Sequence, residues 1–185
     1  MQSRIVLAGI ALMAVSAFTQ GRTAPGVCLP CGPPLLPVPQ RLLPQDSAGA
    51  DSIYVVGVYD PARDPSSDLA AAIERASAEQ KRILIQVGGE WCIWCHILDD
   101  FIRSEKEILS VLGESFVILK VNFDNVNRNE AFLSKYPAIS GYPHIHVLES
   151  DGSFLHSQQT DQLETGRSYS RSAIMGLLRK WAPEG

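Results

Sequence analysis

The chain has 185 residues, of which 45% are hydrophobic and 19% charged, a composition that excludes a disordered or fibrous protein. Against 16 lysines and arginines stand 20 acidic residues, so the formal net charge is −4. This balance argues against a nucleic-acid-binding protein, which normally presents a basic face. The four cysteines form two Cys-x-x-Cys pairs, Cys28/Cys31 and Cys92/Cys95, and this pairing is the most informative feature of the composition.

Residues 1–21 have the pattern of a signal peptide. Arg4 supplies a positive charge, and the 14 residues from Ile5 to Phe18 form an apolar run. That length suits a signal peptide, whereas a transmembrane helix needs about 20 apolar residues. Small residues allow cleavage after Ala17 or after Gly21. We therefore expect a periplasmic or secreted protein in a compartment where disulfides persist, with an uncleaved membrane anchor as the alternative.

Residues 22–50 are expected to form a proline-rich spacer. Seven prolines lie between Pro25 and Pro44, and proline fixes φ and removes a backbone donor. Such a segment is typical of an extended linker. For its cysteines, Cys28 and Cys31, the alternatives are a local disulfide, an electron relay to the second pair, or half of a metal site.

From residue 51 onward, apolar runs alternate with segments of helical periodicity. Apolar runs bounded by turn residues predict strands at 53–58, 83–87, 116–123, 144–148 and 154–156, the last two joined by a hairpin near 151–152. Helices are predicted around 69–76, 94–102, 129–136 and 174–181. Ser104 and Glu107 form a capping-box pattern, which predicts a further short helix ending at Gly113. The order β-α-β-α-β-α-β-β-α predicts an α/β fold with a mixed sheet.

The second cysteine pair lies where a predicted strand gives way to a helix. Cys92 therefore falls at a helix N-terminus, where unpaired backbone N–H groups and the helix dipole stabilise a thiolate. Cys95 follows about one helical turn later, where its sulfur can reach that of Cys92. The pair can exchange between dithiol and disulfide, with Cys92 attacking a substrate disulfide and Cys95 resolving the mixed disulfide.

These features resemble the thioredoxin superfamily over about residues 51–181. The sequence Trp-Cys-Ile-Trp-Cys at 91–95 is similar to the family's Trp-Cys-x-x-Cys motif, in the form found in exported members. Gly141-Tyr142-Pro143 is similar to a second landmark, a proline that opens a strand. The resemblance implies a thioredoxin-like domain over residues 51–185, with a central mixed sheet flanked by helices.

The resemblance also implies an activity and a set of site residues. Cys92 and Cys95 are the expected catalytic residues of an exported thiol:disulfide oxidoreductase, with the reductase or isomerase direction favoured. Pro143 is expected to be cis beside the reactive disulfide, and Tyr142 to offer backbone hydrogen bonds to the substrate. The residues expected to bind substrate are Trp91, Trp94, Tyr142 and Pro143, although Trp94 is equally consistent with a core position.

Client proteins with disulfides or thiols and a membrane thiol-electron donor are the expected partners. No nucleic acid, no cofactor, no metal and no stable membrane insertion after signal removal are expected. Two departures from the family pattern leave mechanistic questions open. Gln86 stands where cytosolic thioredoxin has a buried Asp, so the proton acceptor for Cys95 is open, and Glu90 is expected to be exposed. The dipeptide Ile93-Trp94 lacks the usual second-position proline, which leaves the redox direction open.

Several other interpretations of these residues remain. Cys92 to His96 also matches the Cys-x-x-Cys-His signature of c-type haem attachment, but the predicted strands and the lone candidate ligand Met175 argue against it. The pair could form a purely structural disulfide, or the surface around Trp91 could serve a non-catalytic binding module. His144 and His146 share one strand face, yet no further ligand pattern supports a metal there.

Overall fold

The computed structural model describes residues 51–184. The predicted signal peptide, the proline-rich spacer and the Cys28/Cys31 pair lie outside the described residues. Over residues 51–184, none of the helices combines the length and the hydrophobicity required to span a bilayer.

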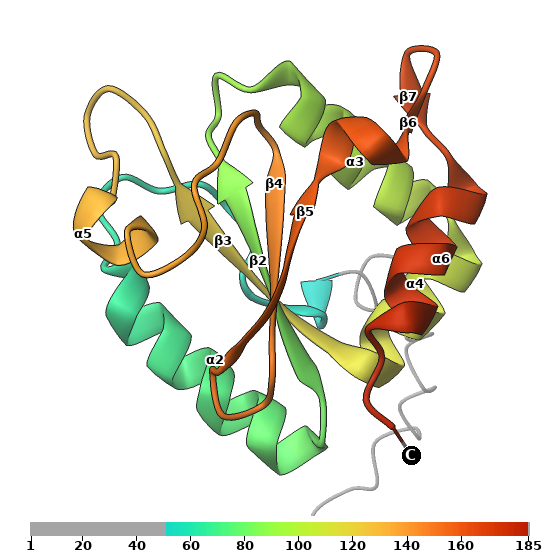
Figure 1. The fold of residues 1–185 in the computed structure, drawn as a ribbon, viewed down its shortest axis with the longest axis horizontal. Helices are drawn as coiled ribbons and strands as arrows, with labels where there is room; N and C mark the ends of the chain where they lie inside the picture. Colours follow the sequence, from blue (N-terminus) through green and yellow to red (C-terminus); the bar gives the residue numbers. More distant parts are fainter. Residues whose placement is uncertain (1–50, 185) are drawn as a thin grey trace, which may run out of the picture. The chain divides into compact units, whose positions relative to one another are not determined.

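A five-stranded mixed sheet forms the centre of the domain (Figure 1), with its strands in the order β1-β3-β2-β4-β5. β3 runs parallel to both β1 and β2, whereas β4 runs antiparallel to β2 and to β5. The strands are β1 (Tyr54–Val56), β2 (Arg82–Gly88), β3 (Phe116–Asn122), β4 (His144–Leu148) and β5 (Phe154–Gln159). The predicted α/β architecture with a mixed sheet is therefore confirmed.

Helices cover both faces of this sheet, as Figure 1 shows with α2 and α5 on one side and α3, α4 and α6 on the other. Successive side chains of a strand point to opposite faces, so Leu84 joins the core under α3, α4 and α6 while Ile83 and Ile85 join the core under α2. The helices are α2 (Pro65–Glu79), α3 (Ile93–Ser104), α4 (Lys106–Ser115), α5 (Glu130–Leu133) and α6 (Arg171–Lys180).

The predicted capping box at Ser104 is wrong. Ser104 is the last residue of α3, and its hydroxyl donates to the carbonyl of Phe101 at 2.8 Å. Glu105 is the N-cap of α4 and makes no side-chain capping bond, and the helix continues through Gly113 to Ser115. The pattern failed because Ser104 is still part of α3, so the N-cap of the next helix falls one residue later, on Glu105.

Other differences lie at the edges of elements. The helix predicted at 129–136 is a single turn, since Asn129 has a left-handed backbone (φ 50°) and the chain continues in turns up to Tyr136. β5 extends beyond its predicted end to Gln159. Three short elements were not predicted: the 3₁₀ helix η1 (Thr160–Leu163), and the strands β6 (Glu164–Thr165) and β7 (Ser168–Tyr169) of a small hairpin.

The direction of the strands decides which loops come together. β2 and β3 are parallel, so their carboxyl ends lie at the same edge of the sheet. β4 is antiparallel to β2 and pairs Val87 with His144, so β4 begins at this same edge. The loop from β2 to α3 and the segment just before β4 are therefore neighbours.

Two buried histidines lie on the β4 face that packs toward α5. His146 is fully buried, stacks on Tyr136 with ring centroids 5.0 Å apart, and lies 4.7 Å from the ring of His144. Within residues 51–184, neither ring nitrogen of His146 has a hydrogen-bond partner. Burial, and secondarily the neighbouring His144, lowers the pKa of His146 to about 4. The fold therefore holds this side chain in its neutral form.

This depressed pKa predicts acid sensitivity of the fold. In the unfolded chain His146 titrates near pH 6.5, so between about pH 6.5 and pH 4 the unfolded state binds more protons than the folded state. The free energy of unfolding should fall over this window by up to about 3 kcal/mol from this residue alone. Denaturant unfolding at a series of pH values measures it, and His146→Phe should flatten the slope. Equal slopes in the two proteins would contradict the assignment.

Candidate functional site

The cysteine pair lies at the first turn of α3. Cys92 is the N-cap, with extended backbone (φ −89°, ψ 99°), and its Sγ accepts a hydrogen bond from the Cys95 backbone N–H at 3.2 Å. The two residues form a disulfide, with Cα atoms 5.2 Å apart. Cys92 is 3% exposed and Cys95 is fully buried. Backbone N–H groups at this position stabilise negative charge on sulfur, so the arrangement suits thiolate chemistry at Cys92.

Two glycines allow the loop between β2 and α3 to pass this close to the sulfur atoms. A Cβ atom at Gly88 would overlap the Sγ of Cys95 and would lie 3.1 Å from the ring and hydroxyl of Tyr59. A Cβ atom at Gly89 would lie 2.7 Å from the indole ring of Trp91. Contacts shorter than 3.0 Å essentially never occur for real Cβ atoms, so a side chain at Gly88 would have to displace the buried Cys95 sulfur, and one at Gly89 would have to displace the Trp91 ring.

Trp91 and Tyr142 meet at the surface beside the disulfide. Trp91 is 58% exposed, and its indole N–H donates to the carbonyl of Phe123 at 2.7 Å. Its ring lies edge-on to Tyr142 with centroids 5.7 Å apart, and Tyr142 stacks on Phe123 at 4.8 Å. The structure thus brings two predicted substrate-binding residues together, and it adds Phe123 at the end of β3, which the sequence did not single out.

The other two predicted substrate-binding residues are less accessible. The Tyr142–Pro143 peptide bond is cis, as the resemblance implied. Pro143 is buried, and its carbonyl accepts a hydrogen bond from the Thr160 hydroxyl at 2.5 Å. Trp94 is partly buried, packs edge-on against Tyr169 at 5.7 Å, and contacts both the cysteine pair and the main core. Its position is mainly that of a core residue.

An open groove of about 520 Å³ adjoins Trp91. Two of its lining side chains, Trp91 and Val126, are apolar and exposed. The groove-lining residues are Glu90, Trp91, Phe123, Asp124, Asn125, Val126 and Arg128. This surface can receive an apolar side chain next to the disulfide.

Glu90 is exposed, as expected from the sequence. Its carboxylate accepts a hydrogen bond from the Tyr59 backbone N–H at 3.4 Å and lies 3.8 Å from the imidazole of His96. The His96 ring also contacts the Glu90 carbonyl oxygen at 2.8 Å. These contacts fix the loop that leads into the cysteine pair.

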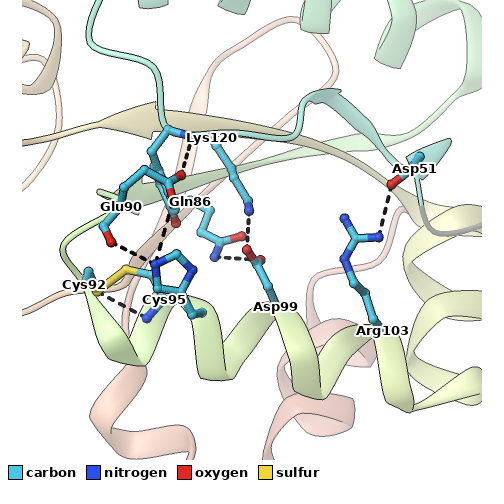
Figure 2. A network of polar contacts seen from close by, with 10 residues as sticks. Asp51, Gln86, Glu90, Cys92, Cys95, Asp99, Arg103 and Lys120 are labelled. Carbon is cyan, nitrogen blue, oxygen red and sulfur yellow. Dashed lines mark hydrogen bonds and ion pairs between the residues drawn. A yellow bond between two sulfur atoms is a disulfide. The ribbon is translucent and has the colours of Figure 1, made fainter. Parts of the chain in front are cut away.

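A buried polar network lies deeper along α3 (Figure 2). The Asp99 carboxylate forms an ion pair with Lys120 of β3, and the side-chain amide of Gln86 lies 3.5 Å from the other carboxylate oxygen. Asp99 follows Cys95 by four residues, which puts both side chains on one face of the helix. A partly buried carboxylate is therefore present one helical turn from Cys95, but it comes from the helix and not from the strand position that Gln86 occupies.

Sequence reasoning missed this network, although one signal was available. Lys120 is the only charged residue within the apolar strand β3. Buried lysines are almost always paired, so its position called for an acidic partner from a neighbouring element.

The fold does not favour the haem alternative. Met175, the candidate second ligand, is buried in the core on α6. His144 contacts the Ser157 hydroxyl at 2.7 Å through its Nε2 atom. In the part of the chain that the structure describes, no group of three or more His, Cys, Asp or Glu residues is placed to hold a metal ion.

Comparison with known proteins gives consistent matches. The chain is 26% identical over 111 residues to the thiol:disulfide interchange protein DsbD of Pseudomonas fluorescens, covering 60% of this chain and 18% of that protein. It is 25% identical over 92 residues to the disulfide bond reductase DsbH of Chlamydia pneumoniae, covering 45% of this chain and 55% of that protein. The chain thus spans only a part of either relative.

A solved structure and a family profile extend these matches. The crystal structure of a disulphide isomerase from Xylella fastidiosa Temecula1 aligns with a TM-score of 0.57 and 25% identity, covering 66% of this chain and 94% of that one. Residues 64–150 match the sequence profile of a family described as thioredoxin-like. With the strand order and the Cys92–Cys95 pair, these matches show that the chain contains a thioredoxin-like domain with the thioredoxin-like α/β fold.

Proposed function

We propose that this protein is a thiol:disulfide oxidoreductase that exchanges disulfides with client proteins through Cys92 and Cys95. The observation that carries the proposal is the position of the pair, with Cys92 as the N-cap of α3 and Cys95 bonded to it one turn later. The names of the similar proteins support it, since they describe disulfide interchange, disulfide reduction and disulphide isomerisation.

The proposed mechanism assigns different tasks to the two sulfurs. The Cys92 thiolate attacks a client disulfide, forms a mixed disulfide and releases one client thiolate. Cys95 then attacks the Cys92 sulfur, which releases the second client thiolate and leaves the Cys92–Cys95 disulfide. Cys92 takes the first step because it is the less buried of the two and, as the N-cap of α3, its sulfur accepts the Cys95 backbone N–H. A membrane thiol donor outside this domain would return the pair to the reduced form, so the reductase or isomerase direction is favoured.

The client is proposed to lie across Trp91 and Tyr142. The T-shaped contact between these rings holds both side chains in place and forms an apolar surface beside the disulfide. The adjoining groove of about 520 Å³ has room for a client side chain. Pro143, behind Tyr142, is proposed to shape this surface through its backbone, since the Thr160 hydroxyl anchors its carbonyl. Trp94 is proposed to contribute through its packing against the cysteine pair.

The proposed location is the periplasm or the cell exterior. The supporting feature is the apolar run of residues 5–18, which has the length of a signal-peptide core. Residues 22–50 would then act as a spacer between the processed N-terminus and the domain of residues 51–185.

An insulin-reduction assay with dithiothreitol separates this function from a non-catalytic binding module. The wild-type protein should accelerate insulin precipitation, because exchange through a reactive thiol is faster than through free dithiothreitol. Cys92→Ser should abolish the acceleration. A wild-type protein that gives no acceleration would favour a binding module around Trp91.

The reduced protein should show unequal thiol reactivity. Cys92 should react with iodoacetamide at least about tenfold faster than Cys95 at neutral pH, because only Cys92 lies at the helix N-terminus, and its rate should titrate below the free-thiol pKa of about 8.5. Mass spectrometry of the two labelled positions across a pH series measures both quantities. Equal rates, or an unshifted titration, would contradict the assignment of Cys92 as nucleophile.

Cys95→Ser should trap clients. Without the resolving thiol, turnover stops at the mixed disulfide, so Cys92 should hold client proteins in bonds that survive non-reducing denaturing gels and disappear with dithiothreitol. Cys92→Ser is the matched control and should trap little, because Cys95 is fully buried. Trapping by Cys92→Ser but not by Cys95→Ser would reverse the assignment of the two sulfurs.

A further inference from the structure

Tyr59 is a buried phenol that the proposed mechanism does not yet use. It follows β1 and is 4% exposed, and it forms a small buried cluster with Cys92 and Cys95. Among residues 51–184, no hydrogen bond of ordinary geometry reaches its hydroxyl in the disulfide form of the protein, and the polar group that lies close to it is the side chain of Gln86. Leaving a buried hydroxyl unpaired costs free energy. The hydroxyl is therefore available as a donor to a group of the cysteine cluster that becomes a stronger acceptor when the disulfide opens.

The Tyr59 hydroxyl and the Cys95 sulfur converge on the same space. A Cβ atom placed on Gly88 would overlap the Cys95 Sγ and would lie 3.1 Å from the Tyr59 hydroxyl oxygen. Because Gly88 has no side chain, the space between the Cys95 Sγ and the Tyr59 hydroxyl stays open on this side. A disulfide sulfur accepts hydrogen bonds weakly, whereas bonds to a charged acceptor are shorter and about twice as strong as neutral ones.

The surroundings keep Tyr59 protonated. Burial raises the pKa of Tyr59 well above its usual value, and the nearby Asp99 carboxylate acts in the same direction. Lys120 lies with its Nζ 5.0 Å from the centre of the Tyr59 ring and is paired with Asp99. Lys120 thereby offsets the negative charge that Asp99 places one turn from Cys95, and it leaves the phenol as a neutral donor.

We propose that the Tyr59 hydroxyl donates a hydrogen bond to the Cys95 sulfur whenever that sulfur is a thiolate. When an incoming thiolate attacks the Cys92 Sγ, a new S–S bond forms to Cys92, the Cys92–Cys95 bond breaks, and its electron pair leaves on Cys95. The reverse step, in which Cys95 resolves a mixed disulfide, starts from the same thiolate. Tyr59 keeps its proton in both directions. This inference rests on the proposed redox function of the pair.

The test compares Tyr59→Phe with Tyr54→Phe. Tyr54 is a matched control, because it is also buried, its hydroxyl also lacks a hydrogen-bond partner within the described residues, and Lys120 lies 5.4 Å from its ring centre. It belongs to the main core, however, and not to the cysteine cluster. Each substitution removes one buried oxygen atom that makes no hydrogen bond of ordinary geometry in the oxidised protein, so neither oxidised variant should melt below the wild type.

The readout is the equilibrium of the pair with glutathione across a pH series. Tyr59→Phe should lower the equilibrium constant for reduction about tenfold at high pH, which corresponds to about 30 mV for a two-electron couple. The effect should shrink at low pH, where Cys95 is a neutral thiol. Tyr54→Phe should match the wild type at every pH. As a second measurement, thiolate absorbance in a Cys92→Ser background should show a higher Cys95 pKa with Tyr59→Phe than with Tyr54→Phe.

The outcomes separate this inference from the function on which it rests. If the wild-type pair cannot be reduced by glutathione or dithiothreitol, the proposed function fails and the inference fails with it. If the wild type is redox-active but Tyr59→Phe behaves like Tyr54→Phe at every pH, only the role of Tyr59 is overturned.

Discussion

The antiparallel pairing of β4 with β2 is the constraint on which the site depends. Val87 at the end of β2 lies opposite His144 at the start of β4, so Tyr142 and Pro143 reach the edge of the sheet from which α3 departs. A shift of one residue in this register would turn every β4 side chain to the opposite face. The buried His146 would then leave its stacking partner, and the residues before β4 would lose their position beside the cysteines.

Below the cysteines, the domain buries charge where a simple core would be apolar. Desolvation of two charged groups offsets most of their attraction, so a buried ion pair contributes little net stability. The effect of the Asp99–Lys120 pair is instead local. Asp99 lies on the same helix face as Cys95, while Lys120 contacts the rings of both Tyr54 and Tyr59. The charged and polar groups around the Cys95 sulfur therefore come from α3, β3 and the segment around β1. In cytosolic thioredoxin a single buried Asp occupies the strand position that Gln86 holds here.

The sequence was sufficient for the architecture because its strongest signals are local and periodic. The apolar runs at 83–87 and 116–123 depend only on neighbours along the chain, and both were predicted correctly as strands apart from their ends. The position of the motif at 91–95, directly after a predicted strand, likewise predicted a helix N-terminus at Cys92, and Cys92 is the N-cap of α3. The Ser104 pattern failed because a local rule cannot detect that the preceding helix continues through Ser104 and moves the next N-cap to Glu105.

The residues that sequence reasoning missed are those defined by tertiary contact. The relation of Asp99 to Lys120, and of Tyr59 to Cys95, exists only once strands distant in sequence are paired. The two-residue strands β6 and β7 are too short to show any period. The burial of Trp94 also required the structure, because it depends on Tyr169, which the β6–β7 hairpin supplies.

The placement of the indole rings has an optical consequence. Trp94 packs against the Cys92–Cys95 cluster, and Trp91 lies in the same loop, whereas Trp181 stacks on His156 at the far end of α6. A disulfide in contact with an excited indole accepts an electron and quenches its emission. Trp94 is thus a built-in reporter of the sulfur oxidation state, and Trp181 provides a constant background. The intrinsic fluorescence of the unlabelled protein should therefore brighten when the bond opens.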